Sequence, residues 1–443
     1  MNNFSTSQNL VKANSYFKKN RLDEACELYL QVLQTFPENS RAIEGLVRSH
    51  EKLVSQHLKT LYSMLHDGQL KLVLEQAQML TRKFTHAFSL WNLLGIAFTE
   101  HGSLSLSIEC YKKALIIKPD HAQAFNNLGN SLRIVGDIEN AITSFQQAIN
   151  IKANYALAHI NLGLALNKKG EFKQAIKSYQ EAIRLNPNDA NLYIKVGNIQ
   201  MDDGNSDAAI RSYKKALKIS PNSGTANHML AAVTGITPDT ASREYVEHLF
   251  DAYAPSFEDS LINNLQYAMP RALAKVAIEH QPKRSFGSIL DLGCGTGLMG
   301  LELRELTQKL EGIDLSSEML KQAYSKEIYD RLTQGDIVEF LKSAELDFNY
   351  YFAADVFIYI GNLFEIFALI KNRNKEGGKL IFSTEHSEKD GFVLEQSGRY
   401  SHSKNYIQEL CEELNYQMIH FSQVDLRRER EKLITGGIYL LNF

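Results

Sequence analysis

The sequence predicts a protein in two parts, an α-solenoid followed by an α/β domain with a Rossmann-like sheet. Two observations lead to this fold class. Within residues 6–235, a pattern of small and aromatic residues returns every 34 positions, and a fixed period of this length is typical of stacked helical repeats. Further along, the segment 289–300 reads as an apolar strand, a glycine-rich turn and the start of a helix. Open α/β sheets bind nucleotides with such a unit.

The repeat pattern is clearest between residues 88 and 221. A glycine is followed after 16 positions by a large aromatic residue in the pairs Gly95 and Tyr111, Gly129 and Phe145, and Gly163 and Tyr179. A small residue lets two paired helices approach, and a ring fills the space between them. We expect six helix pairs, give or take one, with a lone helix at 223–234 closing the stack.

The pattern is degenerate between residues 40 and 87. We expect one helix over 41–53, followed by a weak repeat from 61 to 80 that lacks the usual aromatic and proline residues. The Asp67-Gly68 pair predicts the turn inside that repeat.

Composition narrows the possible functions. A net charge of −3 and a pI near 6.5 leave no basic footprint, which argues against a nucleic-acid partner. The four cysteines are scattered, which suits a reducing compartment and predicts neither a metal site nor a disulfide framework. Because no run of 18 apolar residues occurs, we expect no membrane partner and a cytoplasmic location.

The glycine-rich turn identifies a candidate cofactor site. Glycines alternate at Gly293, Gly295 and Gly297 around Cys294, where side chains would hold a ligand away from the backbone. The glycine-rich segment also matches the sequence motif of dinucleotide-binding proteins. Asp291, however, sits two residues before the first glycine, where a carboxylate suits an ammonium group better than a pyrophosphate.

Two further acids follow at the ends of predicted strands. Asp314, next to Leu315, ends the second strand and is suited to accept hydrogen bonds from both hydroxyls of a ribose. Asp336, next to Ile337, ends the third strand and could bind an adenine amino group while the isoleucine packs on the ring. Three acids at three successive strand ends are far more specific than one glycine turn.

The segments ILDLGCGTG, GIDLSSEMLKQA and QGDI, in this order, resemble the class I methyltransferases that depend on S-adenosylmethionine (SAM). The resemblance covers roughly 245–443. It implies a seven-stranded sheet whose last strand is antiparallel, and SAM as the cofactor. A dehydrogenase or a relic that binds no cofactor is the alternative. The implied cofactor-binding residues are Asp291, Gly293, Cys294, Gly295, Gly297, Asp314, Leu315, Asp336, Ile337 and Asp355.

The repeats resemble the tetratricopeptide (TPR) repeat, whose first helices line a concave groove. Asn127 and Asn161 occupy the same position in consecutive repeats. The resemblance implies that their amides could bind an extended protein or peptide in the groove. Alternatively, the asparagines belong to a solvated helix face.

Three regions are expected: the repeat array with its closing helix over 1–237, a linker and helical lid over 238–287, and the methyltransferase domain over 288–443. The Thr-Pro-Asp sequence at 237–239 interrupts the helical pattern. The lid sequence FDAYAPSFED resembles that of a bacterial group in which repeats and methyltransferase share one chain. Tyr253 could close over the methionine end of the cofactor, unless it belongs to the helix's own apolar stripe.

Candidate catalytic and substrate-binding residues lie near the ends of the later strands. Tyr359 follows the fourth strand, and Glu385 and His386 end the fifth. His386 could act as a general base or could be a structural histidine. Four further residues could bind an anionic substrate group, or their arginines could pair with nearby acids: Arg399, Tyr400, His402 and Arg427.

These observations predict a cytoplasmic, bacterial SAM-dependent methyltransferase that modifies an oxygen or nitrogen of a protein or peptide recruited by the array. Two alternatives remain open. The acceptor could be a small molecule, with the array used for assembly, or the protein could be a repeat scaffold whose domain binds SAM without turnover. The sequence leaves the oligomeric state unknown and predicts no metal.

Overall fold

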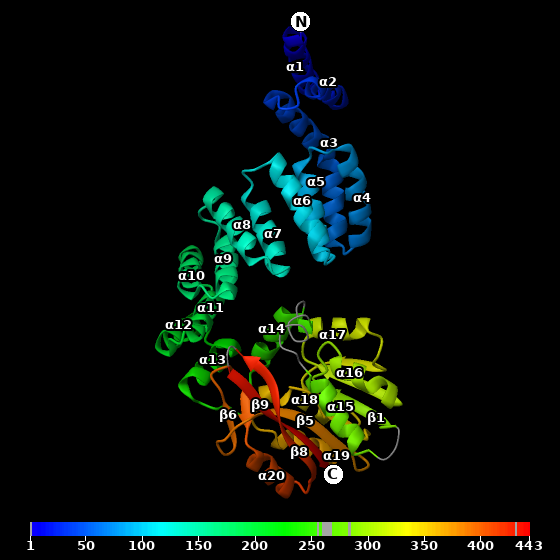
Figure 1. The fold of residues 1–443 in the computed structure, drawn as a ribbon, viewed down its shortest axis with the longest axis vertical. Helices are drawn as coiled ribbons and strands as arrows, with labels where there is room; N and C mark the ends of the chain where they lie inside the picture. The colour runs from blue at the N-terminus through cyan, green and yellow to red at the C-terminus, as the bar shows by residue number, and fades with distance from the viewer. Residues whose placement is uncertain (1, 255–256, 259–267, 282–284, 430–431) are drawn as a thin grey trace. The chain divides into compact units, whose positions relative to one another are not determined.

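The chain folds into two compact units, Met1–Asp203 and Gly204–Phe443, each described by itself below (Figure 1). The computed structural model describes residues 2–254, 257–258, 268–281, 285–429 and 432–443. Helices fill the first unit, whereas the second combines helices with a mostly parallel sheet. The expected fold class, a repeat solenoid followed by an α/β domain, is confirmed.

The first unit is a row of antiparallel helices joined by short turns. Its helices are α1 (Asn2–Lys18), α2 (Leu22–Thr35), α3 (Ser40–His66), α4 (Leu70–Lys83), α5 (Phe88–Glu100), α6 (Leu104–Ile117), α7 (Ala122–Ile134), α8 (Ile138–Ile151), α9 (Ala156–Lys169), α10 (Phe172–Leu185) and α11 (Ala190–Asp202). From α5 onward, each repeat contributes one pair.

The predicted small-to-large packing holds the pairs together. A Cβ atom added at Gly95 would lie 2.7 Å from the ring of Tyr111, and one added at Gly163 would lie 2.6 Å from the ring of Tyr179. Both rings are almost fully buried. These contacts leave no room for a side chain, so the glycine requirement is steric at both positions.

The degenerate region differs from the prediction. The predicted helix ends near residue 53, whereas α3 extends to His66 and is 27 residues long in total. Buried positions recur at helical spacing along it, from Ala42 and Leu46 through Val54 to Leu61. Because no proline or glycine interrupts residues 46–66, the chain has no reason to break the helix there.

The second unit begins with helices that the sequence assigns to the array. These two helices are α12 (Ser206–Ile219) and α13 (Gly224–Thr234). After them, outside the predicted array, come α14 (Arg243–Tyr253) and α15 (Met269–Glu279). The lone closing helix therefore spans the expected residues. It packs within the same unit as the sheet, since Nε2 of His228 lies 2.8 Å from the carbonyl oxygen of Gly398. The chain divides at 203 and 204, upstream of the expected boundary at 237.

The strands are β1 (Ser288–Leu292), β2 (Lys309–Asp314), β3 (Arg331–Gln334), β4 (Tyr350–Ala353), β5 (Lys379–His386), β6 (Phe392–Leu394), β7 (Tyr400–His402), β8 (Gln417–Glu429) and β9 (Lys432–Asn442). The first five run parallel in the order β3-β2-β1-β4-β5. The last strand, β9, is antiparallel to β5, as expected, and its other edge pairs with β8.

The sheet has nine strands in the described part of the chain, two more than the sequence predicts. The extra pair is the β6–β7 hairpin, which joins the carboxyl end of β5 through β7. Connecting helices complete the domain: α16 (Leu298–Leu303), α17 (Ser317–Ser325), α18 (Ile337–Ser343), α19 (Phe364–Arg373) and α20 (Lys404–Glu413), with short 3₁₀ turns η3 (Arg304–Leu306) and η4 (Phe357–Tyr359).

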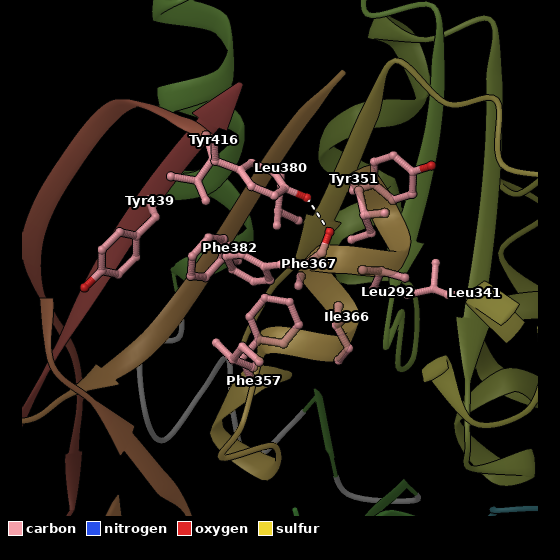
Figure 2. Close-up of a cluster of buried hydrophobic side chains, with 14 of the residues drawn as sticks. Leu292, Leu341, Tyr351, Phe357, Ile366, Phe367, Leu380, Phe382, Tyr416 and Tyr439 are labelled. Carbon is pink, nitrogen blue, oxygen red and sulfur yellow. Dashed lines mark hydrogen bonds between the residues drawn. The ribbon is translucent and has the colours of Figure 1, made fainter. Parts of the chain in front are cut away.

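Apolar side chains bury one face of the sheet under α19 and α20 (Figure 2). Phe382 on β5 stacks on Tyr439 of β9, with ring centroids 4.9 Å apart. The hydroxyl of Tyr416 donates to the carbonyl oxygen of Phe367 at 2.8 Å, which satisfies a buried polar group inside this cluster. A second cluster packs α15 and α16 against the opposite face.

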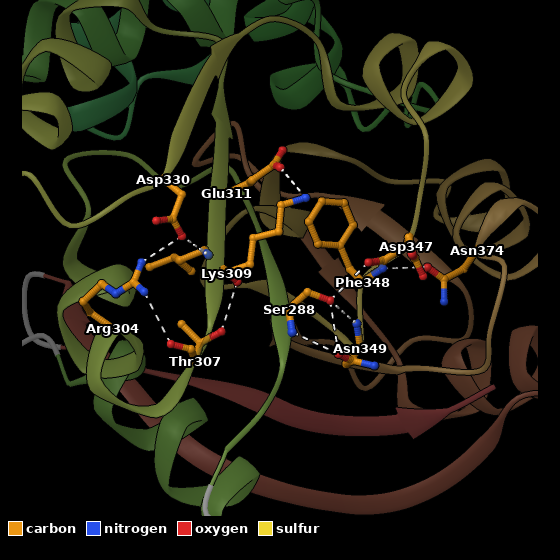
Figure 3. Close-up of polar contacts among 11 residues, drawn as sticks. Ser288, Arg304, Thr307, Lys309, Glu311, Asp330, Asp347, Phe348, Asn349 and Asn374 are labelled. Carbon is orange, nitrogen blue, oxygen red and sulfur yellow. Dashed lines mark hydrogen bonds and ion pairs between the residues drawn. The ribbon is translucent and has the colours of Figure 1, made fainter.

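Polar contacts fix the amino ends of the central strands (Figure 3). Oδ1 of Asn349 accepts hydrogen bonds from the backbone N–H of Ser288 at 2.9 Å and from its hydroxyl at 3.1 Å. These bonds join the starts of β1 and β4. The opposite, carboxyl ends of the strands are then available for a ligand.

The position of α13 predicts where the chain can be cut. A chain starting at Gly204 keeps the contacts of α13 with the sheet domain, whereas one starting at Pro238 loses them. We expect the melting temperature of the shorter chain to be about 5–10 °C lower, corresponding to the loss of 2–3 kcal/mol. Thermal unfolding followed by circular dichroism would measure this, and equal melting temperatures would contradict it.

Candidate functional site

A cavity of about 1020 Å³ lies in the second unit, at the carboxyl ends of β1, β2 and β4. Helix α14 and η4 form much of its remaining wall. This is the edge of an open α/β sheet where ligands bind. Ten of the predicted site residues line the cavity: Gly293, Gly295, Asp314, Leu315, Asp336, Ile337, Asp355, Tyr253, Tyr359 and Arg399.

The backbone of the glycine-rich turn forms part of the cavity wall. Its three glycines have positive φ angles, between 54° and 93°, which residues with a Cβ rarely adopt. A Cβ added at Gly295, or at Gly335 after β3, would meet no atom within 4 Å. Both glycines line the cavity. The space beside them can therefore accept a ligand that lies flat against the backbone.

Asp314 ties the turns after β1 and β2 together. Its Oδ2 accepts from the backbone N–H of Gly295, and its Oδ1 from that of Ser316, both at 2.8 Å. Burial raises the pKa of this carboxyl, and the backbone hydrogen bonds oppose that shift. Each oxygen has a second lone pair, so the carboxylate can still accept from ligand hydroxyls.

Asp336 ends the turn after β3 and caps α18. Its Oδ1 accepts from the backbone N–H of Val338 at 2.9 Å and of Glu339 at 3.1 Å. The cap fixes the carboxylate at the cavity wall beside Ile337. An acid and an apolar side chain thus lie together, as the sequence predicts for the adenine end of a nucleotide.

Asp291 does not line the cavity, in contrast to the other two acids. It is almost fully buried, and the hydroxyl of Tyr329 donates to its Oδ2 at 2.6 Å. Burial raises the pKa of Asp291 to about 7, partly offset by that hydrogen bond. Cys294 is also buried outside the cavity lining. Gly297 instead caps α16.

The turn after β4 shapes the next part of the wall. Asp355 adopts a φ of 56°, unusual for a residue with a side chain. Its backbone N–H donates to the hydroxyl of Ser383, which donates in turn to Oδ1 of Asp355, both at 2.8 Å. The reciprocal bonds hold the strained turn in place. Val356 then packs where a Cβ on Gly293 would lie, only 2.5 Å away.

Helix α14 is held against the turn after β2 by polar contacts that sequence reasoning missed. Oδ1 of Asp251 accepts from the hydroxyl of Ser316 at 2.6 Å. Nε2 of Gln322 donates to the carbonyl oxygen of Ala254 at 2.5 Å. Ser316 also caps α17. Helix α14 is thus attached to α17 and its capping residue, which follow Asp314 at the end of β2. Part of the predicted lid sequence, at 255–256 and 259, lies outside the described residues.

Aromatic side chains of the lid lie against the wall after β4. The ring of Phe250 meets that of Tyr359 edge to face at 5.2 Å, and Tyr253 meets Phe257 at 5.3 Å. All four rings line the cavity. Such a wall favours apolar or aromatic ligand groups and excludes water.

The predicted anion-binding group is not assembled. Of its four members, Arg399 alone is placed at the cavity by the described structure. Tyr400 is fully buried, and Nε2 of the buried His402 contacts the carbonyl oxygens of Ile360 and Gly361. In a strand, residues two apart share a face, so Tyr400 and His402 both point inward. Arg427 lies in β8, and its side chain is outside the described part of the structure.

The end of β5 also differs from expectation. Glu385 is buried and pairs with Arg399, whose Nε lies 2.6 Å from Oε1. His386 does not line the cavity; its Nε2 lies 3.5 Å from Oε1 of the exposed Glu388. The proposed base is therefore placed away from the cavity wall, and its role remains a prediction.

The asparagines of the array form a contact one position away from the predicted pair. Nδ2 of Asn161 on α9 donates to Oδ1 of Asn126 on α7 at 2.9 Å. Asn127, the next residue on α7, is not part of this contact. Asn127 and Asn161 are both half-buried, on the first helices α7 and α9 of successive repeats.

Within the described residues, no group of three or more His, Cys, Asp or Glu side chains could hold a metal ion. A search of the same residues for a helix long and apolar enough to cross a membrane found none.

Comparisons with known families match the helical array and the sheet domain separately. A methyltransferase domain family matches residues 283–434. Tetratricopeptide repeat families match residues 11–39, 95–133, 129–170, 163–204 and 190–223. The matched repeats thus extend from α1 to α12.

Two curated proteins are similar to the C-terminal part. Human methyltransferase-like protein 27 is 35% identical over 98 residues, covering 22% of this chain and 38% of its own. The malonyl-[acyl-carrier protein] O-methyltransferase of Erwinia pyrifoliae is 26% identical over 147 residues, covering 33% and 53%. This chain thus spans about half or less of the length of each relative.

Among solved structures, a crystal structure of MamA is 24% identical over 36% of this chain and 93% of its own, with a TM-score of 0.35. A score this low supports no further comparison.

The buried acid Asp291 predicts a dependence of stability on pH. Its pKa is near 7 when folded and about 3.8 when unfolded. The neutral, protonated form of Asp291 is therefore the one that burial favours. The free energy of unfolding falls as the pH rises from the unfolded pKa to the folded pKa near 7, because the carboxyl has then lost its proton in the unfolded chain but keeps it when buried. Relative to Asp291→Asn, the wild type should lose about 2–3 kcal/mol of unfolding free energy between pH 5 and 7.5.

Urea unfolding of both proteins across this pH range would measure the difference. Asp347→Asn, at an exposed aspartate, is the control and should follow the wild type. A difference between Asp291→Asn and wild type that does not change with pH would contradict the prediction.

Proposed function

Because the chain is a tetratricopeptide repeat array joined to a class I methyltransferase domain, we propose that it transfers a methyl group from SAM to an oxygen or nitrogen of a protein or peptide recruited by the array. The observation that carries the proposal is the cavity at the strand ends. It combines a glycine-rich turn, two fixed carboxylates and an aromatic lid.

The residues at the cavity fit SAM. Gly295 and Gly335 leave open space along the backbone. Asp314 would accept from the ribose hydroxyls, and Asp336 would accept from the adenine amino group beside Ile337. Asp291, bonded to Tyr329 and outside the cavity lining, would act on the ammonium group through a water molecule. When bound, SAM supplies an electrophilic methyl group on a sulfonium.

The protein's own contribution would be orientation and exclusion of water. Methyl transfer disperses a charge, so an apolar enclosure that aligns acceptor and methyl group favours it. Tyr253 and Tyr359 both belong to the aromatic wall of the cavity and would flank the acceptor. A general base would at most assist.

Two cations on the array favour an acidic peptide as the recruited segment. Arg133 on α7 donates through Nη2 to Oδ1 of Asn130 at 2.9 Å, while its buried Nε has no hydrogen-bond partner among the described residues. Burial lowers the pKa of Lys195 on α11; Asp189 opposes the shift and Arg133 adds to it. A carboxylate that contacts either of these half-buried cations would compensate its charge.

A small-molecule acceptor is the second candidate. The cavity is large and much of its wall is apolar, which would also suit an acyl group such as the one named for the Erwinia relative. In that case the array would serve assembly. A repeat scaffold that binds SAM without turnover is the third possibility.

The cofactor assignment predicts the effect of one substitution. Asp314→Ala removes two charge-assisted hydrogen bonds to the ribose and should weaken SAM binding about 10- to 100-fold. Isothermal titration calorimetry of the full chain with SAM would measure this. Asp347→Ala, at an exposed position, should bind as the wild type does. Unchanged affinity in Asp314→Ala would rule out the assignment.

Recruitment by the array predicts which acceptors are methylated. With labelled SAM and cell lysate, label should enter macromolecules. The double variant Arg133→Gln and Lys195→Gln should reduce this labelling about tenfold at low salt, because each lost charge contact is worth about 1 kcal/mol or more.

Lys177→Gln, on the exposed face of the second helix of its repeat, is the matched control and should label normally. A chain starting at Gly204 should also lose macromolecular labelling. If that chain instead labels the small-molecule fraction as fast as the full chain does, the second candidate is correct.

A further inference from the structure

The closing helix of the array contacts the wall of the cavity through one buried histidine. His228 on α13 is almost fully buried, and its Nε2 lies 2.8 Å from the carbonyl oxygen of Gly398. A carbonyl oxygen can only accept, so Nε2 carries the proton. The imidazole also packs against the ring of Tyr245 of α14 in a tilted arrangement, with ring centroids 4.3 Å apart. Donor and ring are thus both fixed.

The residue that accepts this hydrogen bond, Gly398, forms the left-handed turn of the β6–β7 hairpin. Gly398 has a φ of 82°, and a Cβ there would lie 2.7 Å from Oη of Tyr245 and 3.2 Å from Sδ of Met229. The turn is therefore packed directly on α13 and α14. Its backbone N–H donates to the carbonyl oxygen of Glu395 at 2.9 Å. The turn is thus held by its contacts with α13 and α14 and by the hydrogen bond within its own hairpin.

The next residue, Arg399, lines the cavity. Its Nε lies 2.6 Å from Oε1 of Glu385, and both side chains are largely buried. A buried ion pair of this length depends on accurate placement, because a partner that moves away leaves a charge without compensation. The backbone that carries Arg399 starts at the turn held by His228.

We propose that His228 is a positioning residue for substrate binding: by holding the hairpin turn, it sets Arg399 at the cavity wall, where the guanidinium contacts a polar or anionic group of the acceptor. The proposal rests on the proposed methyltransferase function. The last helix of the repeat array thereby completes the substrate side of the catalytic unit. His228 itself does not touch the reacting atoms.

The first test uses the full chain and a direct probe of the arginine. His228→Leu removes the donor, whereas His228→Gln keeps an N–H of similar reach. The Nε–H proton of Arg399 is followed by NMR in protein labelled at arginine side chains, with Arg399→Lys to assign the signal. We expect a protected signal in the wild type and in His228→Gln, and its loss or shift in His228→Leu.

The second test measures methyl transfer from labelled SAM to the macromolecular fraction of a lysate. In His228→Leu, the amount of lysate needed for half-maximal labelling should rise about tenfold, while the SAM concentration needed should stay within twofold. His228→Gln should recover most of the loss. In an Arg399→Lys background, His228→Leu should add less than a threefold effect, because both changes act on one contact.

An unchanged Arg399 signal in His228→Leu, or losses that multiply in the double variant, would overturn the proposal. Should His228→Leu fail to fold, His228→Asn replaces it, since the asparagine amide is too short to reach Gly398. If the wild type labels no lysate fraction, the proposed function fails, and the NMR measurement still decides whether His228 positions Arg399.

Discussion

The carboxylate of Asp314 is the interaction on which the candidate site most depends. It accepts two backbone hydrogen bonds from turns that follow different strands. A buried carboxylate needs such partners, since an unpaired charge in the interior costs several kcal/mol or more. The positive φ angles of the glycine-rich turn present the N–H of Gly295 to it. The conformation of the turn and the position of the acid are therefore coupled.

Much of this arrangement could be predicted from the sequence. Parallel strands bring their carboxyl ends to one edge, so acids at successive strand ends must meet there, as Asp314 and Asp336 do. The repeat array is equally readable, because its packing depends on a small residue and a ring at fixed spacing, as at Gly129 and Phe145.

Other parts of the site depend on contacts that leave no pattern along the chain. Tyr329 reaches Asp291 from 38 positions away and turns the expected cavity acid into a buried one. The strands of the β6–β7 hairpin have three residues each, too few to show an alternation. Without the strand, nothing in the sequence indicates that Tyr400 and His402 face the interior while Arg399 faces the cavity. The hydrogen bond between Asp251 and Ser316 likewise leaves no pattern in the sequence, because the two residues are far apart along the chain.

The division of the chain after α11 has an evolutionary consequence. The second unit includes α12, the second helix of the last matched repeat, and the closing helix α13, whose His228 contacts the hairpin turn. Repeats upstream of α11 could then be gained or lost while the contact of His228 with Gly398 is kept. Descendants of this protein could thus change the length of the array, and with it the choice of partner, while the chemistry stays constant.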